Sequence, residues 1–166
     1  MPDRHSVRIA GDHLVFCAGH FITFAGGCEA LHGHNYRAGI EVWGPLDSAD
    51  GYVVDFVALT DRAKEVVAEF GHKMLVPTAN PLLPVDADER RVRVTYRDRE
   101  WVFPRGDCVL LPVANTTAEL LAGYLADRLL AVLGDRHRFT PTRLRVEVEE
   151  NVGQSAAVCR DLSASG

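Results

Sequence analysis

The sequence predicts an α+β fold in which one antiparallel sheet carries both helices on one face. Two observations lead to it. Short stretches that alternate apolar and polar residues occur in pairs near both ends of the chain, and two longer segments between them repeat apolar residues at helical spacing. The expected order is β-β-α-hairpin-α-β-β. The 166 residues are expected to form one domain, residues 1–166, which buries about two thirds of the surface of the unfolded chain.

The first half of the chain supplies two strands and a helix. Residues 7–17 are mostly apolar with one Gly-Asp interruption, and residues 36–43 alternate, so both are expected to be strands. Residues 26–28, Gly-Gly-Cys, are expected to form a loop between them. Asp55 is expected to cap a helix whose apolar positions continue to Phe70.

The second half supplies a hairpin, a helix and two more strands. Within residues 77–112, prolines come first, and two alternating runs around Asp98 then predict a hairpin. Thr116 is expected to begin the second helix. Residues 144–148 alternate, and residues 155–160 are expected to form the closing strand.

Composition and charge exclude several classes of protein. The net charge of −5 and the absence of a Lys/Arg block argue against a nucleic-acid partner. No apolar run approaches the length of a membrane span and the first ten residues lack an apolar leader, so a cytoplasmic protein without a membrane partner is expected. The four cysteines form no CxxC pair, which indicates neither a disulfide framework nor a thiolate zinc site.

Three histidines are candidate metal ligands. His32 and His34 are two residues apart at the start of a strand, so an extended backbone points both imidazoles to the same side. His20 ends the preceding strand, and a return through the Gly-rich loop would bring it beside the pair. Three neutral imidazoles with one open position are typical of catalytic zinc. The alternative is that these are ordinary surface or partly buried histidines.

Cys28 lies four residues before His32 in the expected loop. A thiol close to a metal and imidazoles would have a lowered pKa and act as a base or nucleophile. Two alternatives stay open: Cys28 is a fourth, structural metal ligand, or it is an inert buried thiol. The other cysteines lie in apolar contexts and are expected to be inert: Cys17, Cys108 and Cys159.

Two further positions are candidate ligand contacts. Glu150 has the parity of the inward apolar residues of its strand, which is unfavourable unless the carboxylate is paired. The paired N–H groups of a guanine-like ring edge would satisfy both oxygens, although a strand that ends at Glu149 would leave Glu150 in solvent. Thr116 and Glu119 fit a capping box, and the Thr116 and Thr117 hydroxyls at this helix start also suit a polar ligand.

Taken in order, several motifs resemble the 6-pyruvoyl tetrahydropterin synthase and 6-carboxy-5,6,7,8-tetrahydropterin synthase family. The most specific is the Cys28-to-Tyr36 string CEALHGHNY. The others, weak alone, are Phe16-Cys17-Ala18-Gly19-His20, Val54-Asp55-Phe56, His72-Lys73-Met74-Leu75, Asn115-Thr116-Thr117-Ala118-Glu119 and Val146-Glu147-Val148-Glu149-Glu150.

The resemblance implies a T-fold, with a four-stranded antiparallel sheet and two helices, assembled as trimers that stack into hexamers with active sites between subunits. It implies that the three histidines hold zinc, that Cys28 is the general base, that His72 of a neighbouring subunit relays its proton, and that Glu150 anchors the pterin. Zinc would polarise oxygens on the C6 side chain of the pterin while Cys28 removes a proton from that side chain. The expected substrate is dihydroneopterin triphosphate or a related pterin of folate, biopterin or queuosine-type pathways.

The chain departs from the family pattern at three places. Gly71 stands where the family has an Asp that orients the relay histidine, residues 77–112 are longer than the usual connection, and Asn151 replaces a Thr. Gly71 motivates an alternative reading, a pterin-binding homologue with reduced or altered activity. A cupin-like metal protein is a third reading, but its pattern expects a Glu three or four residues after His34, and the next acidic residue is Glu41.

Overall fold

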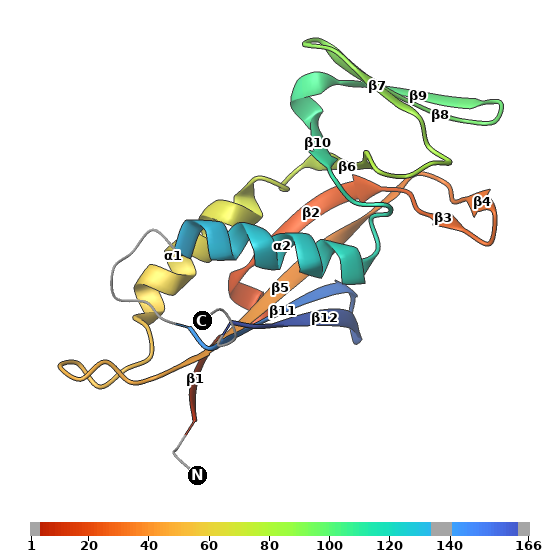
Figure 1. Cartoon of the computed structure of the whole chain (residues 1–166). Helices are drawn as coiled ribbons and strands as arrows, with labels where there is room; N and C mark the ends of the chain where they lie inside the picture. Colours follow the sequence, from red (N-terminus) through yellow and green to blue (C-terminus); the bar gives the residue numbers. More distant parts are fainter. Residues whose placement is uncertain (1–3, 134–140, 163–166) are drawn as a thin grey trace.

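The computed structural model describes residues 4–133 and 141–162. Its centre is a twisted sheet in the order β10-β6-β2-β5-β11-β12, and β1 pairs with the far half of β5 on the same edge as β2 (Figure 1). The strands are β1 (His5–Ile9), β2 (Val15–His20), β5 (His32–Gly44), β6 (Lys73–Pro77), β10 (Cys108–Leu111), β11 (Arg143–Asn151) and β12 (Gln154–Asp161).

Strands β2, β5, β11 and β12 pair antiparallel, which confirms the predicted four-stranded sheet. Residues 7–17 form two strands, not one, because the 3-10 turn η1 (Gly11–His13) separates β1 from β2. Strands β6 and β10 extend the sheet and pair parallel to their neighbours, which the sequence did not predict. Four of the five β6 residues are buried, so the strand is an unbroken apolar run without alternation.

Both helices cover one face of the sheet, as predicted (Figure 1). In α1 (Phe56–Ala68) the Asp55 side chain accepts a hydrogen bond of 2.7 Å from the Ala58 backbone N–H, which confirms the predicted cap. Helix α2 is Ala118–Leu133 and begins two residues later than expected. The helices pack on a core that includes Phe16, Tyr36, Ile40, Leu59, Leu125 and Val146. Two helices of 13 and 16 residues exclude a cupin-like barrel.

Residues between β6 and β10 form a small separate sheet. Strands β8 (Arg91–Tyr96) and β9 (Arg99–Pro104) make the predicted hairpin, β7 (Val85–Ala87) adds a third strand, and the turn η2 (Arg105–Asp107) leads to β10. We call residues 78–107 the insertion. A second apolar cluster joins the insertion to the ends of β2 and β6: Phe21, Met74, Val76, Leu83, Val92, Val94, Tyr96 and Cys108.

The segment expected to be a Gly-rich loop is itself a short hairpin, β3 (Thr23–Phe24) and β4 (Gly27–Cys28). Ala25 and Gly26 connect the strands with φ of 49° and 75°. A two-residue connection with positive φ at both positions is the turn that matches strand twist. Cys28 therefore lies on a paired strand and not in a flexible loop. Among the described residues, no helix is both long and apolar enough to cross a membrane.

Candidate functional site

Antiparallel pairing of β2 with β5 brings the three predicted histidines together. His20 lies directly opposite His32, and Ala18 lies opposite His34, so the side chains of all three emerge on the helix side of the sheet. The ring centroids of His20 and His32 are 4.6 Å apart, and those of His32 and His34 are 4.9 Å apart. His20 is 1% exposed, whereas the His32 ring opens to solvent.

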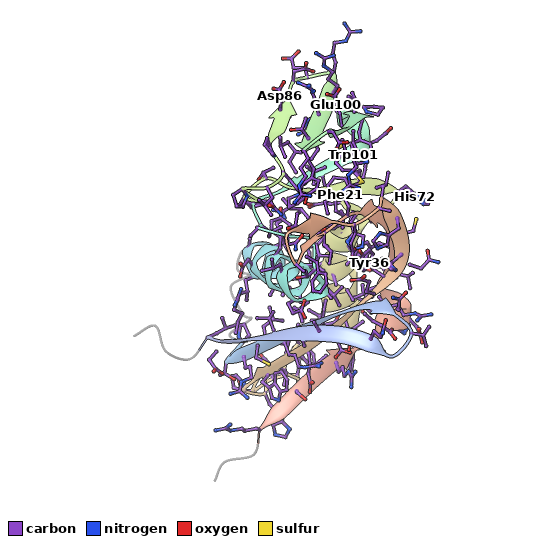
Figure 2. The ribbon with its side chains drawn as sticks, turned by 90° about the vertical axis from the view of Figure 1, so that its right-hand side faces the viewer. Phe21, Tyr36, His72, Asp86, Glu100 and Trp101 are labelled. Carbon is purple, nitrogen blue, oxygen red and sulfur yellow. The ribbon has the colours of Figure 1, made fainter. Side chains whose placement is uncertain are left out.

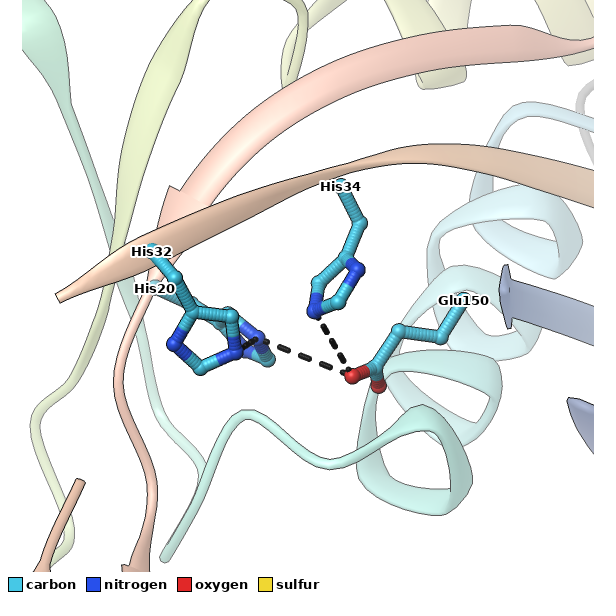
Figure 3. Close-up of side chains that lie close together, drawn as sticks. All are labelled: His20, His32, His34 and Glu150. Atoms are coloured by element: carbon cyan, nitrogen blue, oxygen red, sulfur yellow. Dashed lines mark hydrogen bonds and ion pairs between the residues drawn. The ribbon is translucent and has the colours of Figure 1, made fainter. Parts of the chain in front are cut away.

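Glu150 joins this group from β11 (Figure 3). The pairing of β11 with β12 shifts by one residue between Glu149 and Asn151, so Glu150 is the extra residue of a β-bulge, a feature that redirects a side chain. The Glu150 Oε1 atom lies 2.9 Å from His34 Nε2 and 3.8 Å from His20 Nε2. The carboxylate thus turns inward as its parity predicts, but it lies within the histidine group and not apart from it.

Hydrogen bonds assign the proton to the Nδ1 atom of each histidine. His20 Nδ1 lies 3.1 Å from the Thr116 carbonyl oxygen, and His32 Nδ1 lies 2.8 Å from the Ala30 carbonyl oxygen. Carbonyl oxygens only accept, so both Nδ1 atoms are donors. His34 Nδ1 lies 3.2 Å from Asn151 Oδ1, another acceptor. In the neutral rings of His20 and His32 the Nε2 atoms therefore carry lone pairs, while His34 Nε2 lies against the Glu150 carboxylate.

The three Nε2 atoms and the Glu150 carboxylate face one another. The Nε2 atoms of His20 and His32 are 3.2 Å apart, and the buried His34 Nε2 atom has the Glu150 Oε1 atom 2.9 Å away. One ligand atom from each of the four residues lies within 4.8 Å of the others. A cation among three imidazole nitrogens and a carboxylate oxygen would be bound by all four, so the group fits a metal ion. The bonds from Nδ1 to backbone carbonyls are those that orient metal-binding histidines in other proteins.

The protonation of His20 suits the same role. Burial lowers the pKa of His20 to about 4, against the opposing effect of the Thr116 carbonyl. The imidazole is therefore neutral near neutral pH, and its Nε2 lone pair is available for a metal ion. Thr116 is fully buried, and its hydroxyl donates to the Phe21 carbonyl oxygen at 3.3 Å. Thr116 thus supports His20, which differs from the direct ligand contact expected from the sequence, while Thr117 remains half-buried.

The surroundings of Cys28 differ from the prediction. Burial raises the pKa of its thiol, the nearby Arg99 guanidinium opposes this, and the Glu29 carboxylate adds to it. In the described part of the chain the charged groups that act on Cys28 are thus Arg99 and Glu29, not the histidines. The lowering of the Cys28 pKa expected from a metal ion and imidazoles stays a prediction.

His72 lies on the opposite face of the sheet from the histidine group. Its backbone N–H donates to the Cys17 carbonyl oxygen at 2.7 Å, and its Nδ1 atom lies 3.1 Å from Cys17 Sγ. Because residues alternate along β2, Cys17 projects from the face away from His20. His72 also has a φ of 57°, an uncommon conformation for a residue with a side chain, often found at functional sites. Cys17, expected to be inert, is the side-chain partner of His72.

A cavity of about 550 Å³ borders this second face. Its lining includes Cys17, His72, Lys73, Gly33 and Asn35, together with parts of His32 and His34 at the strand ends. The cavity therefore reaches from the Cys17–His72 pair to the edge of the histidine group. Within one chain, however, β2 and β5 separate His72 from the imidazole Nε2 atoms.

The sequence did not predict the roles of three residues near the site: Asn151, Cys17 and Arg99. Asn151 holds His34, but in the sequence it is noticeable only as a departure from a family motif. Cys17 approaches His72 across 55 positions of sequence, and Arg99 approaches Cys28 across 71. No local pattern predicts these two contacts.

Comparison with known proteins agrees with this geometry. Residues 12–161 match the family described as 6-pyruvoyl tetrahydropterin synthase. The chain belongs to this family. A Methanocaldococcus jannaschii relative named as a 6-carboxy-5,6,7,8-tetrahydropterin synthase is 28% identical over 150 residues, covering 90% of this chain and 88% of the relative.

Solved structures of the family share the fold. A Plasmodium vivax 6-pyruvoyltetrahydropterin synthase carrying a substitution of a catalytic glutamate has a TM-score of 0.88 and 27% identity, covering 96% of this chain and 99% of the other. The Plasmodium falciparum enzyme has a TM-score of 0.85 and 28% identity over the same shares. The predicted T-fold is thus confirmed, and the family is one of pterin synthases.

Proposed function

We propose that this pterin synthase homologue is a zinc-dependent lyase that acts on dihydroneopterin triphosphate or a closely related pterin, with 6-pyruvoyl or 6-carboxy type chemistry. The observation that carries the proposal is the convergence of three histidine side chains, His20, His32 and His34, in a chain of this family. Neutral imidazole nitrogens are ligands that zinc prefers.

His20, His32 and His34 would hold the zinc ion. When bound, zinc would supply Lewis acidity toward oxygens of the pterin side chain. The backbone carbonyls of Thr116 and Ala30 keep two of the rings in the tautomer that a metal needs. Glu150, whose Oε1 atom lies 2.9 Å from His34 Nε2, would turn its carboxylate to the N–H edge of the pterin, since the two oxygens of a carboxylate match a pair of N–H donors. Thr117 is a second proposed pterin contact.

Cys28 would act as the general base toward the pterin side chain, and His72 would relay the proton. The relay requires a second copy of the chain, because β2 and β5 separate His72 from the histidine group of its own chain. The proposal therefore includes a homo-oligomer, a trimer or hexamer with active sites between subunits. A cytoplasmic location and a single domain over residues 1–166 remain predictions.

Two observations bear on how active the enzyme is. Gly71 supplies no carboxylate to orient His72, and the Cys17 thiol occupies the position next to His72 Nδ1. A pterin-binding homologue with reduced or altered activity is therefore the alternative. The catalytic glutamate of the Plasmodium vivax relative suggests a second candidate base, because an exposed glutamate, Glu29, follows Cys28 directly.

The test is product analysis. The zinc-loaded protein is incubated with dihydroneopterin triphosphate, and the products are identified by mass spectrometry beside the variants Cys28→Ala and Glu29→Ala. We expect a 6-pyruvoyl or 6-carboxy pterin from the wild type and loss of turnover in Cys28→Ala. Loss only in Glu29→Ala would move the base to Glu29. Pterin binding without any product would favour the alternative.

A further inference from the structure

The insertion is built onto the hairpin that carries Cys28. The Tyr96 hydroxyl donates a hydrogen bond of 2.6 Å to the Gly26 carbonyl oxygen, and the Arg97 guanidinium donates one of 3.0 Å to the same atom. Asn80, at the start of the insertion, donates to the Thr23 hydroxyl oxygen at 2.9 Å. The insertion thus contacts strand β3 and the turn that connects β3 to β4.

Arg99 contacts the backbone of Cys28 itself. Its Nη2 atom donates to the Cys28 carbonyl oxygen at 2.6 Å, and its Nη1 atom donates to the Glu29 carbonyl oxygen at 3.4 Å. The planar fork of the guanidinium therefore bridges two consecutive carbonyls, which the single ammonium of a lysine cannot reproduce. Two bonds from one rigid group define the orientation of the Cys28 backbone as well as its position.

Aromatic rings hold Arg99 in place. The guanidinium carbon lies 5.0 Å from the centroid of the Trp101 ring and 5.2 Å from that of Tyr96, both within the range of cation–π attraction. Trp101 in turn stacks on Phe21, with centroids 4.6 Å apart (Figure 2). Phe21 is fully buried and directly follows His20. An unbroken series of contacts therefore links Arg99 to the strand that supplies a proposed metal ligand.

The charge of Arg99 acts on the Cys28 thiol as well. Burial and the Glu29 carboxylate both raise the pKa of Cys28, and Arg99 is the group that lowers it, through its charge and through hydrogen bonding. Arg97 binds the neighbouring Gly26 carbonyl and brings a second cation to the hairpin. A nearby cation favours the thiolate over the thiol.

We propose that Arg99 is a positioning residue for Cys28: the insertion fixes the backbone of the proposed base and sets a cationic group beside its sulfur. This inference rests on the proposed role of Cys28. It gives the insertion a part in the chemistry of the site. Removal of Arg99 would leave the metal ligands intact, while the thiol loses a nearby cation and the carbonyls of Cys28 and Glu29 each lose one hydrogen bond.

The test measures the thiol directly. Zinc-loaded protein is alkylated with iodoacetamide over a range of pH, and mass spectrometry follows the Cys28 peptide, with the Cys17, Cys108 and Cys159 peptides as internal references. In Arg99→Met we expect the pH midpoint of Cys28 alkylation to rise by about one unit, which slows its alkylation at neutral pH about tenfold. The control is Arg93→Met, since Arg93 lies in the same insertion but pairs with Glu100 at 2.5 Å.

A second measurement separates position from charge. In Arg99→Lys the charge stays but the fork is lost, so deuterium exchange of the amides of residues 26–29 should be faster than in the wild type, as in Arg99→Met. If Arg99→Met does not fold, Arg99→Lys decides the question by this exchange. Wild-type alkylation in Arg99→Met together with wild-type exchange in the folded variants would overturn the proposal.

These readouts do not depend on catalysis. If the wild type has no turnover on dihydroneopterin triphosphate but the alkylation and exchange shifts occur, the proposed function fails and the role of Arg99 toward Cys28 stands. If the wild type turns over, Arg99→Met should lower kcat with little change in KM, because the variant leaves the pterin contacts in place.

Discussion

Removal of the His32 side chain should have opposite effects on the metal-free and the metal-bound protein. His32 is exposed, and its loss in His32→Ala breaks one hydrogen bond to Ala30, worth about 0.5–1.5 kcal/mol. The same change removes the repulsion between lone pairs 3.2 Å apart on His32 and His20. The two effects offset each other. Without metal, the free energy of unfolding of the variant should therefore lie within about 1 kcal/mol of that of the wild type.

The metal-bound protein should behave differently. Free zinc at one hundred times its dissociation constant stabilises the wild type by about 2.7 kcal/mol, and in a domain of this size that raises Tm by about 5–11 °C. His32→Ala should lose most of this rise, because one of three imidazoles is missing. Thermal unfolding with and without zinc, together with elemental analysis, measures both effects. His5→Ala, a change at an exposed histidine outside the group, is the control.

A zinc-induced rise in Tm and a metal content in His32→Ala equal to those of the wild type would refute the reasoning. The metal would then lie elsewhere, and the converging lone pairs would need another explanation. A large loss of stability in the metal-free variant would contradict the repulsion argument but not the assignment of the metal ligands.

Three further changes test the remaining parts of the site. Cys28→Ala should keep its zinc and lose turnover; loss of zinc, by elemental analysis, would make Cys28 a metal ligand. Glu150→Gln should weaken pterin binding by about 1.5–3 kcal/mol in calorimetry, the scale of a charge-assisted hydrogen bond; a fall in zinc content with it would assign Glu150 to the metal instead. Gly71→Asp should raise turnover without changing pterin affinity, more so combined with Cys17→Ala, which frees His72 Nδ1; brisk wild-type turnover that Gly71→Asp leaves unchanged would contradict this.

Local pattern predicted the parts of the fold that local physics determines. Alternation defined the central part of β5, helical spacing defined both helices, and the Asp55 cap is visible in sequence because a carboxylate next to a helix start satisfies free N–H groups. The spacing of His32 and His34 predicted their shared face for the same reason, since strand geometry has a period of two.

Contacts between distant segments could not be read in this way. Strand β6 is buried on both faces, so it has no alternation to detect. The approach of Cys17 to His72 depends on the end of α1 and on a left-handed backbone at His72, and nothing near either residue encodes it. Arg99 reaches Cys28 only because the insertion folds back over the β3–β4 hairpin, which is a property of tertiary packing.

The alternation of β2 divides the chemistry of one chain between two centres. On one face of β2, His20 belongs to the histidine group. On the other face, Cys17 contacts His72. Under the proposed assembly each polypeptide therefore supplies His72 to a neighbour's active site and receives the His72 of another copy in its own active site. Two defective chains can then complement each other. Dissociated and reassociated together, His32→Ala and His72→Ala should regain activity that neither has alone, because some centres in the mixed oligomers combine an intact histidine group with an intact His72. Activity that stays absent after mixing would place both functions within a single polypeptide.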